Sequence, residues 1–163
     1  MAVSTSENPT PVRVAQAIGI LGTIYSAGGS MSIAGFMIPA IRQSPTPILL
    51  SQFRQMYRRG SNSAPPIAVV TATALAYVAY HYRLTSVWKQ WALASALSIS
   101  IIPFTFVVIY PTIRTLEGWD DTHGEGIDRK DVIEVISAWN RRHIARSSLS
   151  LLGGLLALYA LIH

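Results

Sequence analysis

Apolar residues dominate four stretches of this chain, and polar stretches separate them. A helix needs about 20 apolar residues to cross a bilayer, so the two shorter stretches must extend into their flanks. Pro65 and Pro66 suit the start of one such helix, and Asp128 suits the N-cap of a long helix that runs into the last stretch. The pattern predicts an all-α integral membrane four-helix bundle, a single domain over residues 1–163, with a long last helix extending into the cytosol. The predicted spans cover about residues 14–41, 66–82, 91–110 and 147–162.

The two long connections, residues 42–65 and 111–146, carry most of the 13 lysines and arginines. Basic residues concentrate on the cytosolic side of membrane proteins, so both connections are predicted to be cytosolic. The first connection also has apolar residues at helical spacing among its arginines, which is typical of an amphipathic helix at the membrane surface. These apolar residues are Leu49, Leu50, Phe53, Met56 and Tyr57. Residues 1–13 are polar and are predicted to form a flexible N-terminus. They lack the basic region of a cleaved signal, so the first apolar stretch is predicted to remain as a membrane anchor.

Composition and motifs exclude several classes of protein. Half of the residues are apolar and 13% are charged, which does not fit an ordinary soluble domain. The net charge of +5 does not indicate a nucleic-acid partner, because the basic residues flank apolar runs. The chain has no cysteine, and its four histidines are scattered without a metal-binding spacing, so no metal site is expected. Nucleotide-binding and hydrolase motifs are also missing.

Small residues recur along the first apolar stretch at helical spacing, at Gly19, Gly22, Ser26, Ser30 and Ala34. In lipid, where packing drives helix association, small residues let two helices approach closely. The stripe therefore favours helix packing within the bundle.

The third apolar stretch contains Pro103, which is predicted to kink the helix and to free a backbone carbonyl. Thr105 and Thr112 lie seven residues apart, so they nearly share one helix face that points toward the cytosolic end. They are candidate binding residues. The alternative is a kinked helix whose threonines bond to their own backbone.

The sequence AWNRRHIARSS, residues 138–148, directly precedes the last apolar run. At about 100° per residue, Trp139, His143 and Arg146 fall on the side of the small residues, while Arg141 falls on the leucine side. Arg141 can extend to lipid phosphates. His143 and Arg146 face the bundle, where ionisable groups are costly and usually functional. The alternative is a structural pair that ties the last helix to its neighbours.

The run IPFTFVVIYPTIRTLEGW, followed by the Trp-x3-His-x2-Arg motif of Trp139, His143 and Arg146, resembles the anthrone oxygenase-like family of small four-span membrane proteins. The Tyr-x-x-Gly motif of Tyr57 and Gly60 resembles the family's first connection. The resemblance covers most of the chain. It implies a fungal tailoring enzyme of aromatic polyketide biosynthesis, located in the endoplasmic reticulum, that oxidises an anthrone to a quinone with molecular oxygen and no cofactor. Anthrone oxygenases often have asparagine where this chain has His143.

The implied reaction begins with removal of a proton from the acidic methylene of the anthrone, and the resulting anion reacts with oxygen. His143 is the candidate base, because histidine titrates near neutral pH, and Arg146 or Arg114 would stabilise the oxyanion. The candidate catalytic residues are His143, Arg146, Tyr57 and Arg114. The candidate substrate-binding residues are Phe53, Thr105, Thr112, Trp119 and Trp139.

Two other functions fit the same residues. A proton-transfer enzyme that uses no oxygen, such as a cyclase, isomerase or dehydratase acting on a polyketide, would need the same base. A membrane scaffold without catalysis would use His143 and Arg146 only for helix packing. The expected partners are a hydrophobic aromatic polyketide and the lipid bilayer, and the sequence leaves open whether the chain forms a homo-oligomer.

Overall fold

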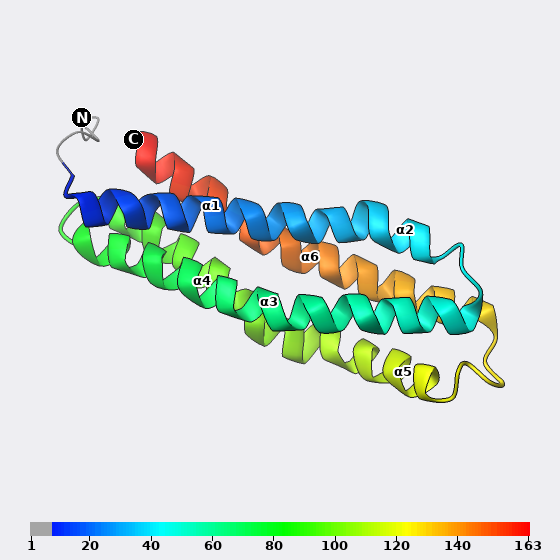
Figure 1. The fold of residues 1–163 in the computed structure, drawn as a ribbon. Helices are drawn as coiled ribbons and strands as arrows, with labels where there is room; N and C mark the ends of the chain where they lie inside the picture. Colours follow the sequence, from blue (N-terminus) through cyan, green and yellow to red (C-terminus); the bar gives the residue numbers. More distant parts are fainter. Residues whose placement is uncertain (1–7) are drawn as a thin grey trace.

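The computed structural model describes residues 8–163, and the described chain is all-helical, as predicted (Figure 1). Residues 1–7 of the predicted flexible N-terminus lie outside the described residues. The N-terminal helix already begins at Thr10, with Pro11 in its first turn, where a missing N–H has no cost. In chain order the elements are α1 (Thr10–Ser32), the π-helical η1 (Ile33–Met37), α2 (Ile38–Ile41), α3 (Thr46–His81), α4 (Trp88–Phe104), the π-helical η2 (Thr105–Ile109), α5 (Tyr110–Asp121) and α6 (Arg129–Ile162).

These elements form four continuous rods that run alternately up and down (Figure 1). Each rod is long and apolar enough to cross a membrane: Thr10–Ile41, Thr46–His81, Trp88–Asp121 and Arg129–Ile162. Both described ends of the chain lie at one end of the bundle, and the two connections that were predicted to share a side lie at the other. The fold class is therefore confirmed, and it fits a multi-pass membrane protein. A rod of 34 residues is about 50 Å long, so part of each rod extends beyond a hydrocarbon core of about 30 Å.

The structure corrects one part of the prediction, the amphipathic helix on the membrane surface. This stretch is helical, but it is the first half of α3 and continues without a break into the second span. Pro65 and Pro66 lie inside α3 and do not start a helix. The apolar side chains Leu49, Leu50 and Phe53 are almost fully buried within the bundle and cannot face lipid headgroups. Packing on other helices thus replaces the predicted contact with the membrane.

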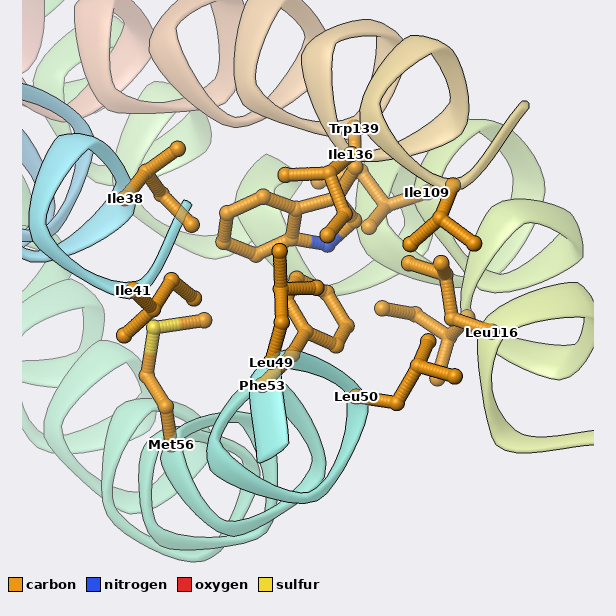
Figure 2. Packing of buried hydrophobic residues seen from close by; sticks show 12 residues of the cluster. Ile38, Ile41, Leu49, Leu50, Phe53, Met56, Ile109, Leu116, Ile136 and Trp139 are labelled. Atoms are coloured by element: carbon orange, nitrogen blue, oxygen red, sulfur yellow. The ribbon is translucent and has the colours of Figure 1, made fainter. Parts of the chain in front are cut away.

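Two apolar cores lie along the bundle. The core nearer to the chain ends contains Leu75, Val78 and Trp91. The core nearer to the long connections contains Phe53, Ile136 and Trp139, together with residues of α2, η2 and α5 (Figure 2). In Figure 2 the indole of Trp139 lies among side chains from α2, α3 and η2. The two cores stabilise the two ends of the bundle, and other side chains occupy the segment between them.

Small residues bring the helices close together near the chain-end core, as the sequence predicted. A Cβ atom added to Gly19 would collide with the side chain of Leu75, and one added to Gly22 would collide with Thr71. On α6, a Cβ atom at Gly154 would lie 2.7 Å from Thr23 Oγ1 of α1. These three glycines are therefore required by close packing between helices, which is the role that small residues have in membrane bundles.

Candidate active site

A cavity of about 350 Å³ lies in the middle of the bundle, between the two apolar cores. All four rods contribute to its wall: α1 with Ser26 and Ser30, α3 with Tyr57, η2 with Thr105, and α6 with the residues described below. Its volume is at the lower end of the range of about 300–1,000 Å³ that small-molecule sites occupy. Most of the lining is apolar, and a few polar groups converge on it, which is the usual composition of a ligand site.

One face of α6 supplies most of the polar groups. The N-cap of α6 is Asp128, as predicted, and its side chain accepts a hydrogen bond from the backbone N–H of Lys130. The helix then runs without interruption to Ile162, so residues three and four apart share a face. Trp139, His143 and Arg146 all line the cavity. The helical phase of the sequence therefore predicted their common direction correctly, and Arg141 is exposed on the outside.

His143 is almost completely buried, with 3% of its surface exposed, and both of its ring nitrogens have partners. Nε2 lies 3.2 Å from the backbone carbonyl oxygen of Ser30. Nδ1 lies 3.3 Å from Nη2 of Arg146. A carbonyl only accepts and a guanidinium only donates, so Nε2 must carry the proton and Nδ1 must be the acceptor. The contacts thus define one neutral tautomer, whose basic nitrogen points toward Arg146.

Arg146 is a partly buried cation without a carboxylate partner among the described residues. Its Nη1 donates to Thr105 Oγ1 at 3.1 Å, and its Nη2 donates to His143. The Thr105 hydroxyl in turn donates to the carbonyl oxygen of Ile101 at 2.6 Å, so its lone pair is directed to Arg146. A guanidinium has five N–H donors, and these two bonds leave some of them for a ligand. A cation held by neutral groups in an apolar cavity favours an anionic ligand.

Aromatic side chains pack against the ring of His143. The indole of Trp139 stacks on the imidazole of His143, with ring centroids 4.6 Å apart and planes inclined by 15°. Phe53 contacts Trp139 edge to face, with centroids 5.0 Å apart. Such aromatic pairs add to the stability gained from burial. Phe53 therefore supports the site through Trp139, and it does not line the cavity.

Tyr57 of α3 also lines the cavity. The side chain is half-buried, and its hydroxyl has no hydrogen-bond partner in residues 8–163. Other aromatic residues mark the open side of the cavity: Tyr25 of α1 and Phe106 of η2 line it but are 68% and 65% exposed. These two side chains lie on the outer surface of rods that are long enough to cross a membrane. The cavity therefore opens sideways, toward the region where lipid would lie.

The structure does not bring every predicted residue to the cavity. Thr112 is buried, but its hydroxyl accepts a hydrogen bond from Arg142, and it lies away from Thr105. The reason is the π-helical η2, which begins at Thr105 and ends before Thr112. Its wider turn changes the spacing, so the two threonines no longer share a face. Arg114 is exposed on α5. Trp119 packs against the connection-side core, outside the cavity wall.

The sequence does not identify several of the residues that line the cavity. Ser26 and Ser30 belong to the small-residue stripe, for which the sequence predicts helix packing, but they line the cavity. Ser150 also lines it, and its position four residues after Arg146 could have indicated this. Gly29 and Gly60 form part of the wall, and a Cβ atom added to either would meet nothing within 4 Å. Their sequence gives little indication of a cavity, because glycines in membrane helices usually allow close helix packing.

No group of three or more histidine, aspartate or glutamate side chains that could hold a metal ion occurs among residues 8–163. Away from the cavity, Arg54 forms ion pairs with Asp120 and Asp121, at 2.9 and 2.6 Å, which join α3 to the end of α5. This cluster lies at the connection end of the bundle. These three residues do not line the cavity, whose polar side chains come from α1, α3, η2 and α6.

The fold and the site together define a four-helix membrane protein with a small-molecule cavity between its helices. The family model described as anthrone oxygenase matches residues 53–156. The anthrone oxygenase AgnL2 of Paecilomyces divaricatus is 30% identical over 87% of this chain and 92% of its own length. The anthrone oxygenase nsrD of Aspergillus novofumigatus is 29% identical over 90% of this chain and 92% of its own length.

A third relative, the anthrone oxygenase ptaC of Pestalotiopsis fici, is 34% identical over 68% of this chain and 82% of its own length. No solved structure matches the chain significantly. The chain belongs to the anthrone oxygenase family. This confirms the resemblance and, with it, the prediction of an oxygenase.

Proposed function

We propose that this oxygenase converts an anthrone-like phenolic substrate of aromatic polyketide biosynthesis into a quinone, with molecular oxygen as the only co-substrate. The observation that carries the proposal is Arg146, a cation with free N–H donors in an apolar cavity and no carboxylate partner among the described residues. Deprotonation of an anthrone creates the enolate oxyanion that such a group would stabilise. The names of the relatives support this substrate class.

His143 is the proposed base, and its contact with Arg146 suggests how it becomes active. In the structure the lone pair of Nδ1 accepts a hydrogen bond from Arg146, so it cannot take a proton. A substrate carbonyl oxygen that binds to Arg146 would draw the guanidinium away and free Nδ1 next to the bound substrate. Nε2 would continue to donate to the Ser30 carbonyl and would keep the ring in place. Substrate binding and the availability of the base are thereby linked.

The proposed reaction balances without any further reagent. His143 takes one proton from the methylene carbon, and Arg146 stabilises the negative charge on the substrate oxygen. The electron-rich carbon transfers electrons to oxygen, and a carbon–oxygen bond forms to give a hydroperoxide. The hydroperoxide takes its proton back from His143. His143 then removes the remaining proton of the same carbon as the O–O bond breaks, and the departing oxygen leaves as water, so one methylene and one oxygen molecule yield one carbonyl and one water. Tyr57 lines the cavity, and its hydroxyl would donate to the departing peroxide oxygen.

The shape of the cavity supports access from the membrane. A flat polycyclic phenol partitions into lipid, and the exposed rings of Tyr25 and Phe106 lie at the side of the cavity that opens toward lipid. We place the protein in the endoplasmic reticulum membrane because of its similarity to fungal members of the family. We place both long connections in the cytosol on the basis of their basic residues and the positive-inside rule. Tagging of the two ends with a glycosylation acceptor tests this orientation, since only a lumenal end would be modified.

The first test uses the purified protein in lipid nanodiscs, with an anthrone as substrate. The expected result is quinone formation with consumption of one oxygen molecule per quinone. Arg146→Met should reduce kcat/KM by about 100- to 1,000-fold, as loss of an oxyanion donor does in other enzymes. Arg142→Met is the matched control, because Arg142 lies on the same helix but is exposed and bonds to Thr112 away from the cavity. It should retain near-normal activity.

The same assay separates the alternatives. If the protein changes a polyketide without taking up oxygen, it is the proton-transfer enzyme and the oxygen step is wrong. If Arg146→Met and His143→Ala fold and keep full activity, the proposed site is wrong. A membrane scaffold would show no turnover of either substrate class, although the lined cavity would then have no evident use.

A further inference from the structure

The serines in the helices of this protein fall into two groups. Most of them bond their hydroxyl to a backbone carbonyl, usually that of the residue three or four positions earlier, as serines in membrane helices commonly do. Ser98 donates to Ala94 at 2.8 Å, Ser147 to His143 at 2.8 Å, and Ser148 to Ile144 at 3.1 Å. The same holds for Ser32, Ser51, Ser61, Ser63, Ser100 and Ser137. Ser95 also donates to a backbone carbonyl, that of Ala72 on α3.

Three helical serines differ. The hydroxyls of Ser26, Ser30 and Ser150 make no hydrogen bond within residues 8–163. All three residues line the central cavity, whereas most of the bonded serines do not. Ser150 is the sharpest case, because only 4% of its surface is exposed. A hydroxyl that borders an apolar cavity without a protein partner gains a hydrogen bond when a polar group of a ligand reaches it. The coincidence of missing bonds with one cavity indicates that these hydroxyls serve a ligand.

The contacts between α1 and α6 place Ser26 and Ser150 on one side of the basic groups. His143 bonds to the carbonyl of Ser30, and Gly154 faces Thr23. The two helices run in opposite directions (Figure 1), so Ser26 and Ser150 lie at about the same level, between these two contacts. Ser150 is four residues from Arg146, which corresponds to about 6 Å along the helix. Ser26 and Ser150 therefore lie about one helical turn from Arg146, toward the ends of the chain, while Ser30 lies at the level of the basic groups.

We propose that Ser26, Ser30 and Ser150 form a second binding subsite that recognises a neutral oxygen substituent of the aromatic substrate, such as a phenolic hydroxyl. A serine hydroxyl can donate and accept, so it suits a hydroxyl group. Among the residues that line the cavity, Arg146 carries the charge and His143 is neutral, so the ligand group beside the serines is neutral. The separation of about one turn corresponds to two positions on a fused ring system. The inference rests on the proposed function, because it names the part of the substrate that this site selects.

The subsite predicts a preference among substrates. Wild-type protein in nanodiscs should oxidise a ring-hydroxylated anthrone with a higher kcat/KM than unsubstituted anthrone. Ser150→Val should reduce this preference about tenfold, which is the usual effect of leaving one substrate hydrogen bond unmade. Ser150→Thr has the same shape as the valine variant and keeps the hydroxyl, so it should retain the preference. The loss should appear mainly in KM for the hydroxylated substrate.

Ser148→Ala is the control on the same helix, since its hydroxyl bonds to the backbone outside the cavity. It should leave the preference unchanged. If Ser150→Val and Ser150→Thr show the same preference as the wild type, the serine subsite is wrong. If the wild type oxidises neither anthrone, the proposed function fails, and equilibrium binding of hydroxylated and unsubstituted anthraquinone still tests the subsite. Equal affinity for the two quinones would overturn it, and a preference lost only in Ser150→Val would support it.

Discussion

Gly60 offers a perturbation in which stability and activity should change in opposite directions. It lies within α3, lines the cavity, and has open space where a side chain would begin. Glycine in a helix interior costs about 0.8–1 kcal/mol relative to good helix formers, so Gly60→Leu should stabilise the helix by a similar amount. For a chain of this size, about 1 kcal/mol raises Tm by roughly 2–4 °C. The leucine side chain would meanwhile occupy part of the cavity of about 350 Å³.

The expected result is a Tm a few degrees higher, measured by thermal unfolding in nanodiscs, together with at least a tenfold loss of kcat/KM for the anthrone. Gly118→Leu is the matched control: Gly118 lies in α5, also has open space at its Cβ position, and does not line the cavity. This variant should raise Tm similarly and keep its activity. Full activity in Gly60→Leu would refute the assignment of the cavity as the active site. A lower Tm would show that Gly60 has a packing role after all.

Two further predictions concern contacts on either side of the cavity. Thr105→Val removes the hydroxyl that accepts a hydrogen bond from Arg146 at 3.1 Å, so kcat/KM should fall about tenfold. In an Arg146→Met background the same change should have almost no further effect on kcat/KM. If the two losses are additive in this double-mutant cycle, the contact does not contribute to activity. Gly154→Ala places a Cβ atom 2.7 Å from Thr23 Oγ1, and this hydroxyl already bonds to the Ile20 carbonyl at 2.7 Å. The substitution should therefore push α1 and α6 apart, cost about 1–3 kcal/mol of stability and lower Tm. Gly28→Ala is the control and should not lower Tm, because its Cβ atom meets nothing within 4 Å.

The architecture followed from the sequence because it depends on patterns within single helices. Four apolar stretches predict four spans, and Asp128 at the start of a long uninterrupted helix predicts α6. The same regularity allowed Trp139, His143 and Arg146 to be assigned to one inward face, because helical phase is reliable where nothing disturbs the helix. The amphipathic half of α3 was harder to interpret. An apolar face at helical spacing has the same appearance whether it contacts lipid headgroups or, as here, other helices.

The rest of the site depends on contacts that no single helix reveals. Thr105 lies at the cavity and Thr112 does not, because the π-helical turn of η2 between them shifts the face of the helix. Periodicity assumes a regular helix and cannot detect this shift. Phe53 and Trp119 could not be separated from true cavity residues, since an aromatic side chain in a core and one in a binding site have the same sequence signal. The role of the Ser30 carbonyl as partner of His143 is likewise a backbone contact, which the sequence does not specify.

The irregular helices also explain why a cavity exists at this level of the bundle. The π-helical segments η1 and η2 each end two residues before a proline, Pro39 and Pro111, and α3 contains Pro65 beside the cavity. A proline removes one backbone hydrogen bond and crowds the preceding turn, and a widened turn relieves this crowding. Two of the four rods thus contain a π-helical turn beside the same space, and α3 contains prolines there. α6 has neither feature, and it carries His143 and Arg146. The regular α6 fixes the positions of the reacting groups, while the widened turns of the two π-helical rods leave room for the substrate.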